Sequence, residues 1–156
     1  MISRVVLCLA LITVVSAENI TKWEFNYKLC GDERITMIYD LPADLSGSYW
    51  LRIELLKDPK NIYVLFNPRF NKQHTVCNSM KNGSWGTEQI TKGDFPFKPG
   101  QQYRIDMQVV KDAIVVSVNG KQYLTFVSPM QPLSDCHYIQ TYNSEVTDIY
   151  KVGTHC

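Results

Sequence analysis

The sequence predicts an all-β fold, a sandwich of short strands. From residue 20 onward, short runs rich in β-branched and aromatic residues alternate with turn signals at even spacing. The turn signals include Leu41-Pro42, Asp58-Pro59, Pro99-Gly100 and Asn119-Gly120. Stretches with helical periodicity and capping residues are absent from this part of the sequence. An all-β sandwich accounts for both observations.

The runs between these turn signals give the expected strands in order. They span 22–29, 35–40, 49–56, 62–67, 74–79, 85–90, 103–109, 113–119, 121–127, 138–142 and 146–152. In the run 62–69, alternation places an apolar set of side chains on one face and a more polar set on the other. The first set is Ile62, Val64 and Phe66, and the second is Tyr63, Leu65, Asn67 and Arg69.

The next two strands continue this polar face. In 74–79, Val76 and Asn78 share one face, and Thr75 and Cys77 share the other. An Asn82-Gly83 turn signal then leads to Trp85. We expect two amides, a guanidinium, a flat ring and a carboxylate to lie on one surface. This set of groups is suited to binding a sugar. These residues are Asn67, Arg69, Asn78, Trp85 and Glu88.

Several spaced motifs resemble the carbohydrate-recognition domain of galectins, over a region from about Asp40 to the C-terminus. They are Phe-Asn-Pro-Arg-Phe at 66–70, Val-Cys-Asn at 76–78, Trp-Gly-Thr-Glu at 85–88, Phe-Pro-Phe at 95–97 and Gly100. The resemblance implies a two-sheet antiparallel, jelly-roll-like sandwich of the galectin or concanavalin type. It also implies a single carbohydrate-recognition domain over 18–156, with no internal repeat to indicate a tandem lectin.

The family reads its sugar with the patterns His-x-Asn-x-Arg, Val-x-Asn and Trp-x-x-Glu-x-Arg. Carried over by position, the resemblance makes Trp85 the stacking platform, and makes the other four residues hydrogen-bonding groups, with Arg69 and Glu88 orienting each other. Those four are Asn67, Arg69, Asn78 and Glu88. Two positions depart from the pattern, because Leu65 replaces the family's His and Ile90 replaces its second Arg.

These departures leave two functions open. The family's His contacts the axial 4-hydroxyl of galactose, and leucine offers no partner there, at a cost of about 1–3 kcal/mol or about 5- to 100-fold in affinity. One reading is a lectin that binds β-galactoside-type glycans or glycoproteins with weakened or altered specificity, in a pocket re-tuned by Leu65, Ile90 and Tyr63. The alternative is a galectin-fold protein that has lost sugar binding and acts through protein contacts.

The first 17 residues predict a cleaved signal peptide. Arg4 precedes the apolar run 5–15, and Val-Ser-Ala follows at 15–17. This run is shorter than the roughly 20 residues that a spanning helix needs, so we expect secretion without membrane insertion. Cleavage would leave 139 residues (156 − 17) with 15 basic (16 − Arg4) and 15 acidic side chains. This balance, without a basic patch, argues against nucleic acid as a partner.

Four cysteines would remain in the mature chain, Cys30, Cys77, Cys136 and Cys156. The alternation of the strand 74–79 predicts that Cys77 faces the core. Four cysteines allow three pairings, of which Cys30–Cys156 is the preferred bridge. Sequons at Asn19 and Asn82 indicate a glycoprotein. A glycan on Asn82 would crowd the site beside Trp85, although turn chemistry alone accounts for Asn82-Gly83.

Catalysis and metal binding have little support in the sequence. A glycosidase needs two carboxylates across one bond, and only Glu88 falls within the motif region. His74, His137 and His155 lack the spacing of metal ligands. We therefore expect no enzyme and no cofactor. The family often forms dimers through sheet edges or faces, so the resemblance allows a homodimer without fixing one.

Overall fold

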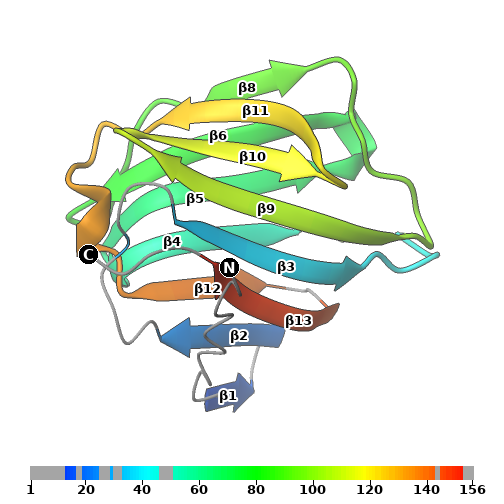
Figure 1. The fold of residues 1–156 in the computed structure, drawn as a ribbon, viewed down its shortest axis with the longest axis horizontal. Coiled ribbons are helices and arrows are strands. Elements are labelled where there is room, and N and C mark those ends of the chain that lie inside the picture. Colours follow the sequence, from blue (N-terminus) through cyan, green and yellow to red (C-terminus); the bar gives the residue numbers. More distant parts are fainter. Residues whose placement is uncertain are drawn as a thin grey trace, which may run out of the picture.

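The protein folds as two antiparallel sheets packed face to face, which confirms the predicted all-β sandwich (Figure 1). The structure is a computed structural model, and it describes residues 13–16, 19–24, 29, 33–45, 51–142 and 145–152. Its 3-10 helices within these ranges are η1 (Phe70–Lys72) and η2 (Leu133–Asp135). None of the described helices is long and apolar enough to cross a membrane.

The larger sheet carries the expected site. Its strands lie in the spatial order β1 (Thr13–Ser16), β2 (Asn19–Glu24), β12 (Tyr138–Tyr142), β4 (Arg52–Asp58), β5 (Asn61–Arg69), β6 (His74–Lys81) and β7 (Ser84–Trp85), and β8 (Gln89–Lys92) also pairs with β6. The smaller sheet has the order β11 (Lys121–Val127), β10 (Ala113–Val118), β9 (Gln102–Val110), β3 (Arg34–Asp40) and β13 (Glu145–Val152).

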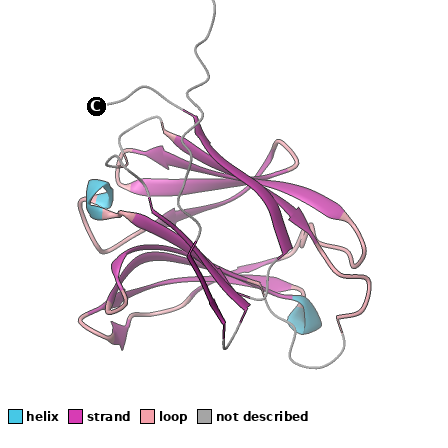
Figure 2. Ribbon diagram, turned by 90° about the horizontal axis from the view of Figure 1, so that it is seen from below, coloured by secondary structure: helices cyan, strands magenta, loops and turns pink. Residues whose placement is uncertain are grey.

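The hydrophobic core fills the space between the two layers of strands, which Figure 2 shows nearly edge-on. Period-2 alternation supplies it from both sides, because every second side chain of a strand faces the opposite sheet. In β9, the alternate residues Ile105, Met107 and Val109 are buried in this core, and from the larger sheet Phe66 and Cys77 join them. The opposite face of β5 and β6 is thereby left to carry the site.

The turn before the expected site has the geometry that its sequence predicts. Asn82 and Gly83 have φ values of 51° and 82°, as a two-residue type I′ hairpin turn requires. The Gly83 amide donates a hydrogen bond to the Lys60 carbonyl oxygen at 2.8 Å, which ties this turn to the turn before β5. The turn therefore fixes where β7 begins. The Asn82 side chain is exposed, and its glycosylation stays a prediction.

The expected single strand 85–90 is wrong. The structure has two short strands, β7 ending at Trp85 and β8 beginning at Gln89, both paired with β6. Between them, the Gly86 amide donates to the Ser79 carbonyl oxygen at 2.9 Å. The Asn78 side-chain amide donates to the Gly86 carbonyl oxygen at 3.0 Å. A side chain thus replaces part of the strand ladder, and Glu88 lies in the segment between the two strands.

The two cysteines in the described residues are buried free thiols, Cys77 and Cys136. Cys77 lies in the core as its parity predicts, and burial raises its pKa from 9.0 to about 12. Cys30 and Cys156 lie outside the described residues, so their bridge stays a prediction. The signal peptide also stays a prediction, and of its residues the structure describes only β1.

Candidate carbohydrate-binding site

The outer face of β5, β6 and β8 brings together most of the expected site residues. Register pairs Leu65 with Asn78 and Asn67 with Val76 across β5 and β6, and it pairs Val76 with Ile90 across β6 and β8. Paired residues of neighbouring strands share a face. Leu65 is 8% exposed, whereas Ile90 is 45% exposed. The two apolar departures from the sugar-binding pattern therefore lie on the expected face, one sheltered and one open.

A chain of hydrogen bonds fixes the charged part of this face. The Asn67 Nδ2 group donates to the Leu51 carbonyl oxygen at 2.6 Å, and Arg69 Nε donates to Asn67 Oδ1 at 3.2 Å. The Arg69 Nη2 group then donates to Glu88 Oε1 at 2.7 Å, which forms the expected ion pair. The Arg69 and Glu88 side chains remain 31% and 44% exposed, so both keep polar atoms open to a ligand. Their charges cancel, so the pair suits a neutral ligand with hydroxyl groups.

Asn78 is more sheltered than its expected role suggests, with only 5% of the residue exposed. Its Oδ1 accepts from the Ser79 amide at 2.8 Å, while its Nδ2 donates to the Gly86 carbonyl oxygen. Both ends of the side-chain amide are thus engaged by the backbone. In this geometry Asn78 positions the segment between Trp85 and Glu88.

Trp85 is exposed, as its place after the turn predicts, with 43% of the residue accessible. It lies opposite Met80 at the end of β7. An exposed indole beside a fixed row of polar groups is a surface on which the apolar face of a sugar ring can stack.

Tyr63 does not line this surface, contrary to the expectation from simple alternation. A register shift between Ile62 and Leu65 interrupts the pairing of β5 with β6. Such a bulge reverses the facing of the residues that precede it. Tyr63 consequently lies in the core cluster, where its hydroxyl donates a hydrogen bond to Asp135 Oδ2 at 3.3 Å. Ile62 is also buried, but outside that cluster. Burial first, and then the Asp135 charge, raise the Tyr63 pKa.

A second polar cluster, which the sequence did not single out, adjoins the site on β4 and β12. Glu54 pairs in register with Leu65 on one side and with Gln140 on the other, and it is 1% exposed. Arg52 forms an ion pair with Glu54, its Nε donating to Oε1 at 2.5 Å. Burial raises the Glu54 pKa, and the Arg52 charge opposes this shift.

The Arg52 guanidinium also contacts two aromatic rings. Its central carbon lies 5.2 Å from the ring centroid of Trp85 and 4.8 Å from that of Tyr142. Gln140 Nε2 in turn donates a hydrogen bond to the Tyr142 hydroxyl oxygen. The signal in the sequence was the alternation Arg52-Ile53-Glu54, which places both charges on one face of a strand beside the site strands.

No group of three or more His, Cys, Asp or Glu side chains within the described ranges could hold a metal ion. His74 is the first residue of β6, and the charges near it are mostly cationic. Partial burial, and then the charges of Arg69, Lys72 and Lys92, lower its pKa. The imidazole therefore stays neutral to lower pH than an ordinary histidine.

The fold and this polar face with its exposed indole define a carbohydrate-binding class of β-sandwich. The family model described as galactoside-binding lectin matches residues 45–151 of the chain. The chain therefore belongs to the galactoside-binding lectin family, the galectins.

Individual relatives agree with this assignment. Galectin-8 of Rattus norvegicus is 37% identical over 78 residues, which cover 49% of this chain and 24% of the rat protein. Galectin-3 of Mus musculus is 34% identical over 120 residues, 65% of this chain and 44% of the mouse protein. The chain thus spans less than half the length of either relative.

Among solved structures, a toad ovary galectin in complex with thio-digalactose superposes with a TM-score of 0.74. The match covers 88% of this chain and 100% of the toad chain at 20% sequence identity, so it supports the fold alone.

Proposed function

We propose that this protein is a secreted lectin that binds β-galactoside-type glycans with altered specificity at the face formed by β5, β6 and the segment from Trp85 to Glu88. The observation that carries the proposal is the hydrogen-bonded row from Asn67 through Arg69 to Glu88 beside the exposed ring of Trp85. Its polar atoms are held in place before a ligand arrives, which reduces the ordering cost of binding.

The altered specificity rests on Leu65 and Ile90. Leu65 offers no hydrogen bond to the sugar hydroxyl that would lie against it, and an unpaired hydroxyl costs about 1–3 kcal/mol. Sugars that lack a polar group at that position lose nothing there, so the site favours them relative to galactose. Ile90 leaves Glu88 with Arg69 as its cationic partner in the site and adds an exposed apolar side chain.

A second candidate function is that of a galectin-fold protein that no longer binds sugar and acts through protein partners. The observation that favours it is the same pair of apolar residues, because Leu65 and Ile90 remove polar groups that the family pattern supplies. A sequon at Asn82, two residues before Ser84 and next to the β7 hairpin, adds to this reading.

A glycan-array screen of the mature, glycosylated protein separates the two functions. The test variant is Arg69→Ala, and the matched control is Arg104→Ala, since Arg104 also forms an ion pair with a carboxylate, that of Asp106, but on the smaller sheet. We expect wild type and the control to bind the same glycans and Arg69→Ala to lose more than about tenfold in affinity. A blank array for the folded wild type, with and without the Asn82→Gln change that removes the sequon, supports the protein-partner function instead.

Secretion has its own test. We expect the full chain, expressed in a secretory cell, to reach the medium with Glu18 as its first residue. N-terminal sequencing of the secreted protein checks this, and retention of residues 1–17 contradicts it.

A further inference from the structure

The Arg52 side chain contacts the indole of the proposed site, although its strand is not a neighbour of β7. Arg52 begins β4, whereas Trp85 ends β7, and β5 and β6 lie between these strands in the sheet. The guanidinium carbon nevertheless lies 5.2 Å from the centroid of the Trp85 ring. Since Arg52 is bound to Glu54, which pairs with Leu65, the guanidinium and the indole meet on the face of the sheet that carries the site.

The ion pair with Glu54 fixes the place of the guanidinium more closely. Glu54, Leu65 and Asn78 form one row across β4, β5 and β6, because Glu54 pairs with Leu65 and Leu65 pairs with Asn78. The guanidinium of Arg52 is bound to Glu54 at one end of this row and lies beside Trp85, which pairs with Met80, two positions beyond Asn78 on β6. Its partner Glu54 lies next to Leu65, the position against which the sugar is expected to rest.

The contact with Trp85 leaves no room for a sugar ring. A pyranose stacked between an indole and a guanidinium makes a van der Waals contact of about 3.5–4.0 Å on each side, which requires roughly 7–8 Å between them. The observed separation is 5.2 Å. A sugar can stack on this face of Trp85 only after Arg52 has moved away.

We propose that Arg52 is a gate, which occupies the sugar-stacking face of Trp85 and must be displaced by a neutral sugar. This inference rests on the proposed function. Two ring contacts and the ion pair with the buried carboxylate of Glu54 hold the gate closed. The apparent affinity of a ligand is proportional to the fraction of molecules in which Arg52 has moved away from Trp85. The gate therefore weakens the binding of every ligand that uses the Trp85 face.

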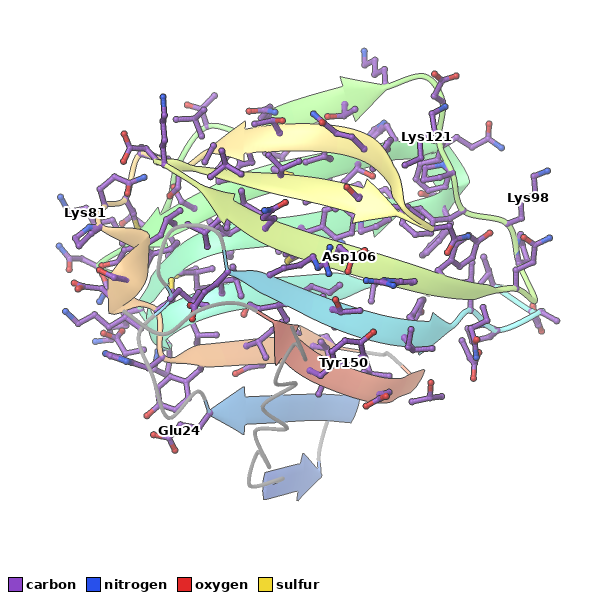
Figure 3. The ribbon with its side chains drawn as sticks, viewed as in Figure 1. Glu24, Lys81, Lys98, Asp106, Lys121 and Tyr150 are labelled. Atoms are coloured by element: carbon purple, nitrogen blue, oxygen red, sulfur yellow. The ribbon has the colours of Figure 1, made fainter. Side chains whose placement is uncertain are left out.

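The test is a calorimetric titration of lactose into the mature protein and its variants. The first variant, Arg52→Ala, removes the gate, and the second, Arg52→Ala with Glu54→Gln, removes it without leaving a buried carboxylate unpaired. Arg104→Ala is the matched control, because Arg104 and Asp106 repeat the same spacing on β9 of the smaller sheet, where Figure 3 labels Asp106. We expect both gate variants to bind lactose about 3- to 30-fold more tightly than wild type and the control to bind as wild type does.

A readout without ligand tests the contact itself. The indole N–H signal of Trp85 in a proton–nitrogen NMR spectrum, assigned by its loss in Trp85→Phe, should shift in both gate variants and stay in place in Arg104→Ala. An unchanged signal overturns the closed gate.

The outcomes also separate this proposal from the function on which it rests. Weaker or equal lactose binding by both gate variants overturns the gate, and if glycan binding still depends on Arg69, the lectin function stands. If neither wild type nor the gate variants bind any glycan on an array, the lectin function fails and the gate fails with it.

Discussion

At the scale of single residues, Leu65 is the central position of the proposed site. It is flanked in register by the carboxylate of Glu54 and the amide of Asn78, so an apolar side chain separates two polar ones. A histidine at this position would place a polar ring between them. The substitution Leu65→His is therefore a direct test of the hydrogen bond that leucine cannot make.

We expect Leu65→His to strengthen lactose binding by about 5- to 100-fold, because the new ring can hydrogen-bond the axial 4-hydroxyl. Cellobiose, whose terminal glucose has an equatorial 4-hydroxyl, should gain much less. Titration of both disaccharides measures the ratio, and Leu65→Met is the volume-conserving control. Equal gains for the two sugars contradict the assigned role of position 65.

The thiols of Cys77 and Cys136 give a prediction that depends on pH. Burial raises the pKa of each from 9.0 to about 12, so the folded protein holds these protons more tightly than the unfolded chain does. Their ionisation therefore lowers the stability of the folded state as pH rises from 9 to 12 and has no effect well below 9. At pH 8 the thiolate fraction is about a thousandfold below that of an exposed cysteine.

We therefore expect iodoacetamide to label these two residues at pH 8 only after denaturation. Peptide mapping of native and denatured samples reports each cysteine separately. Rapid labelling of Cys77 in the native protein would show that it is not held in the core.

The sequence was sufficient for the residues whose spacing follows a family pattern, and insufficient for Arg52. Arg69 and Glu88 were expected to pair, and they do so at 2.7 Å. Arg52 belongs to a strand that the patterns do not include, and its contact with Trp85 depends on which strands are neighbours in the sheet. That order is a property of the tertiary fold, so no local pattern in the sequence reveals it.

At the scale of elements, the break between β7 and β8 controls how Glu88 meets Arg69. Gly86 lies in this break, where an added Cβ atom would be 3.2 Å from Asn78 Oδ1. That distance is too short for an ordinary contact, so the Asn78 side chain would have to shift.

We expect Gly86→Ala to weaken glycan binding by about 2- to 12-fold, because a displaced Asn78 no longer positions the segment that carries Glu88. Gly93→Ala is the control, since a Cβ there meets no atom within 4 Å and only its φ of +83° is unfavourable. The control should lose about 1–2 kcal/mol of stability and keep its affinity. Titration and urea unfolding of both variants check this, and unchanged binding by Gly86→Ala contradicts it.

Sequence patterns located most strands but missed two local irregularities. The run 85–90 suggested one strand because its alternation continues through Gly86, and the competing hydrogen bonds come from Asn78 and Ser79 on another strand. Likewise, the bulge that turns Tyr63 inward depends on the pairing of β5 with β6. Alternation within one strand cannot show where the pairing with a neighbouring strand shifts or breaks.

At the scale of the whole molecule, a cluster of aromatic rings around Phe97 joins the two sheets. The Phe97 ring lies 5.1 Å from that of Tyr103 on β9, 6.3 Å from Tyr123 on β11 and 6.4 Å from Phe66 on β5. Edge-to-face pairs of this kind add to the free energy gained from burial. Phe97 therefore links strands of both layers.

We expect Phe97→Ala to destabilise the protein by about 3–5 kcal/mol, as a cavity replaces a ring packed between the sheets. Urea unfolding measures the loss. Phe95→Ala, at the partly buried margin of the cluster, should cost less. A loss for Phe97→Ala no larger than that for Phe95→Ala would mean that the cluster does not join the layers.

The division of strands between the two layers lies beyond what the residue pattern predicts. The run 103–109 was expected to be a strand, and β9 covers it. It did not indicate that β9 would pair with β3 and β10. Resemblance to a family supplied the two-sheet arrangement, because pairing between distant strands leaves no mark within either strand.

The split of the outer strand into β7 and β8 affects how molecules of this protein meet one another. A long, straight border strand presents a row of open amide and carbonyl groups, onto which another chain can add and begin a fibre. Here the border beside β6 is divided by the segment at Gly86 and Thr87, and the exposed side chains of β8 include Lys92. The break that places Glu88 beside Arg69 thus also shortens the open border onto which a second chain could add.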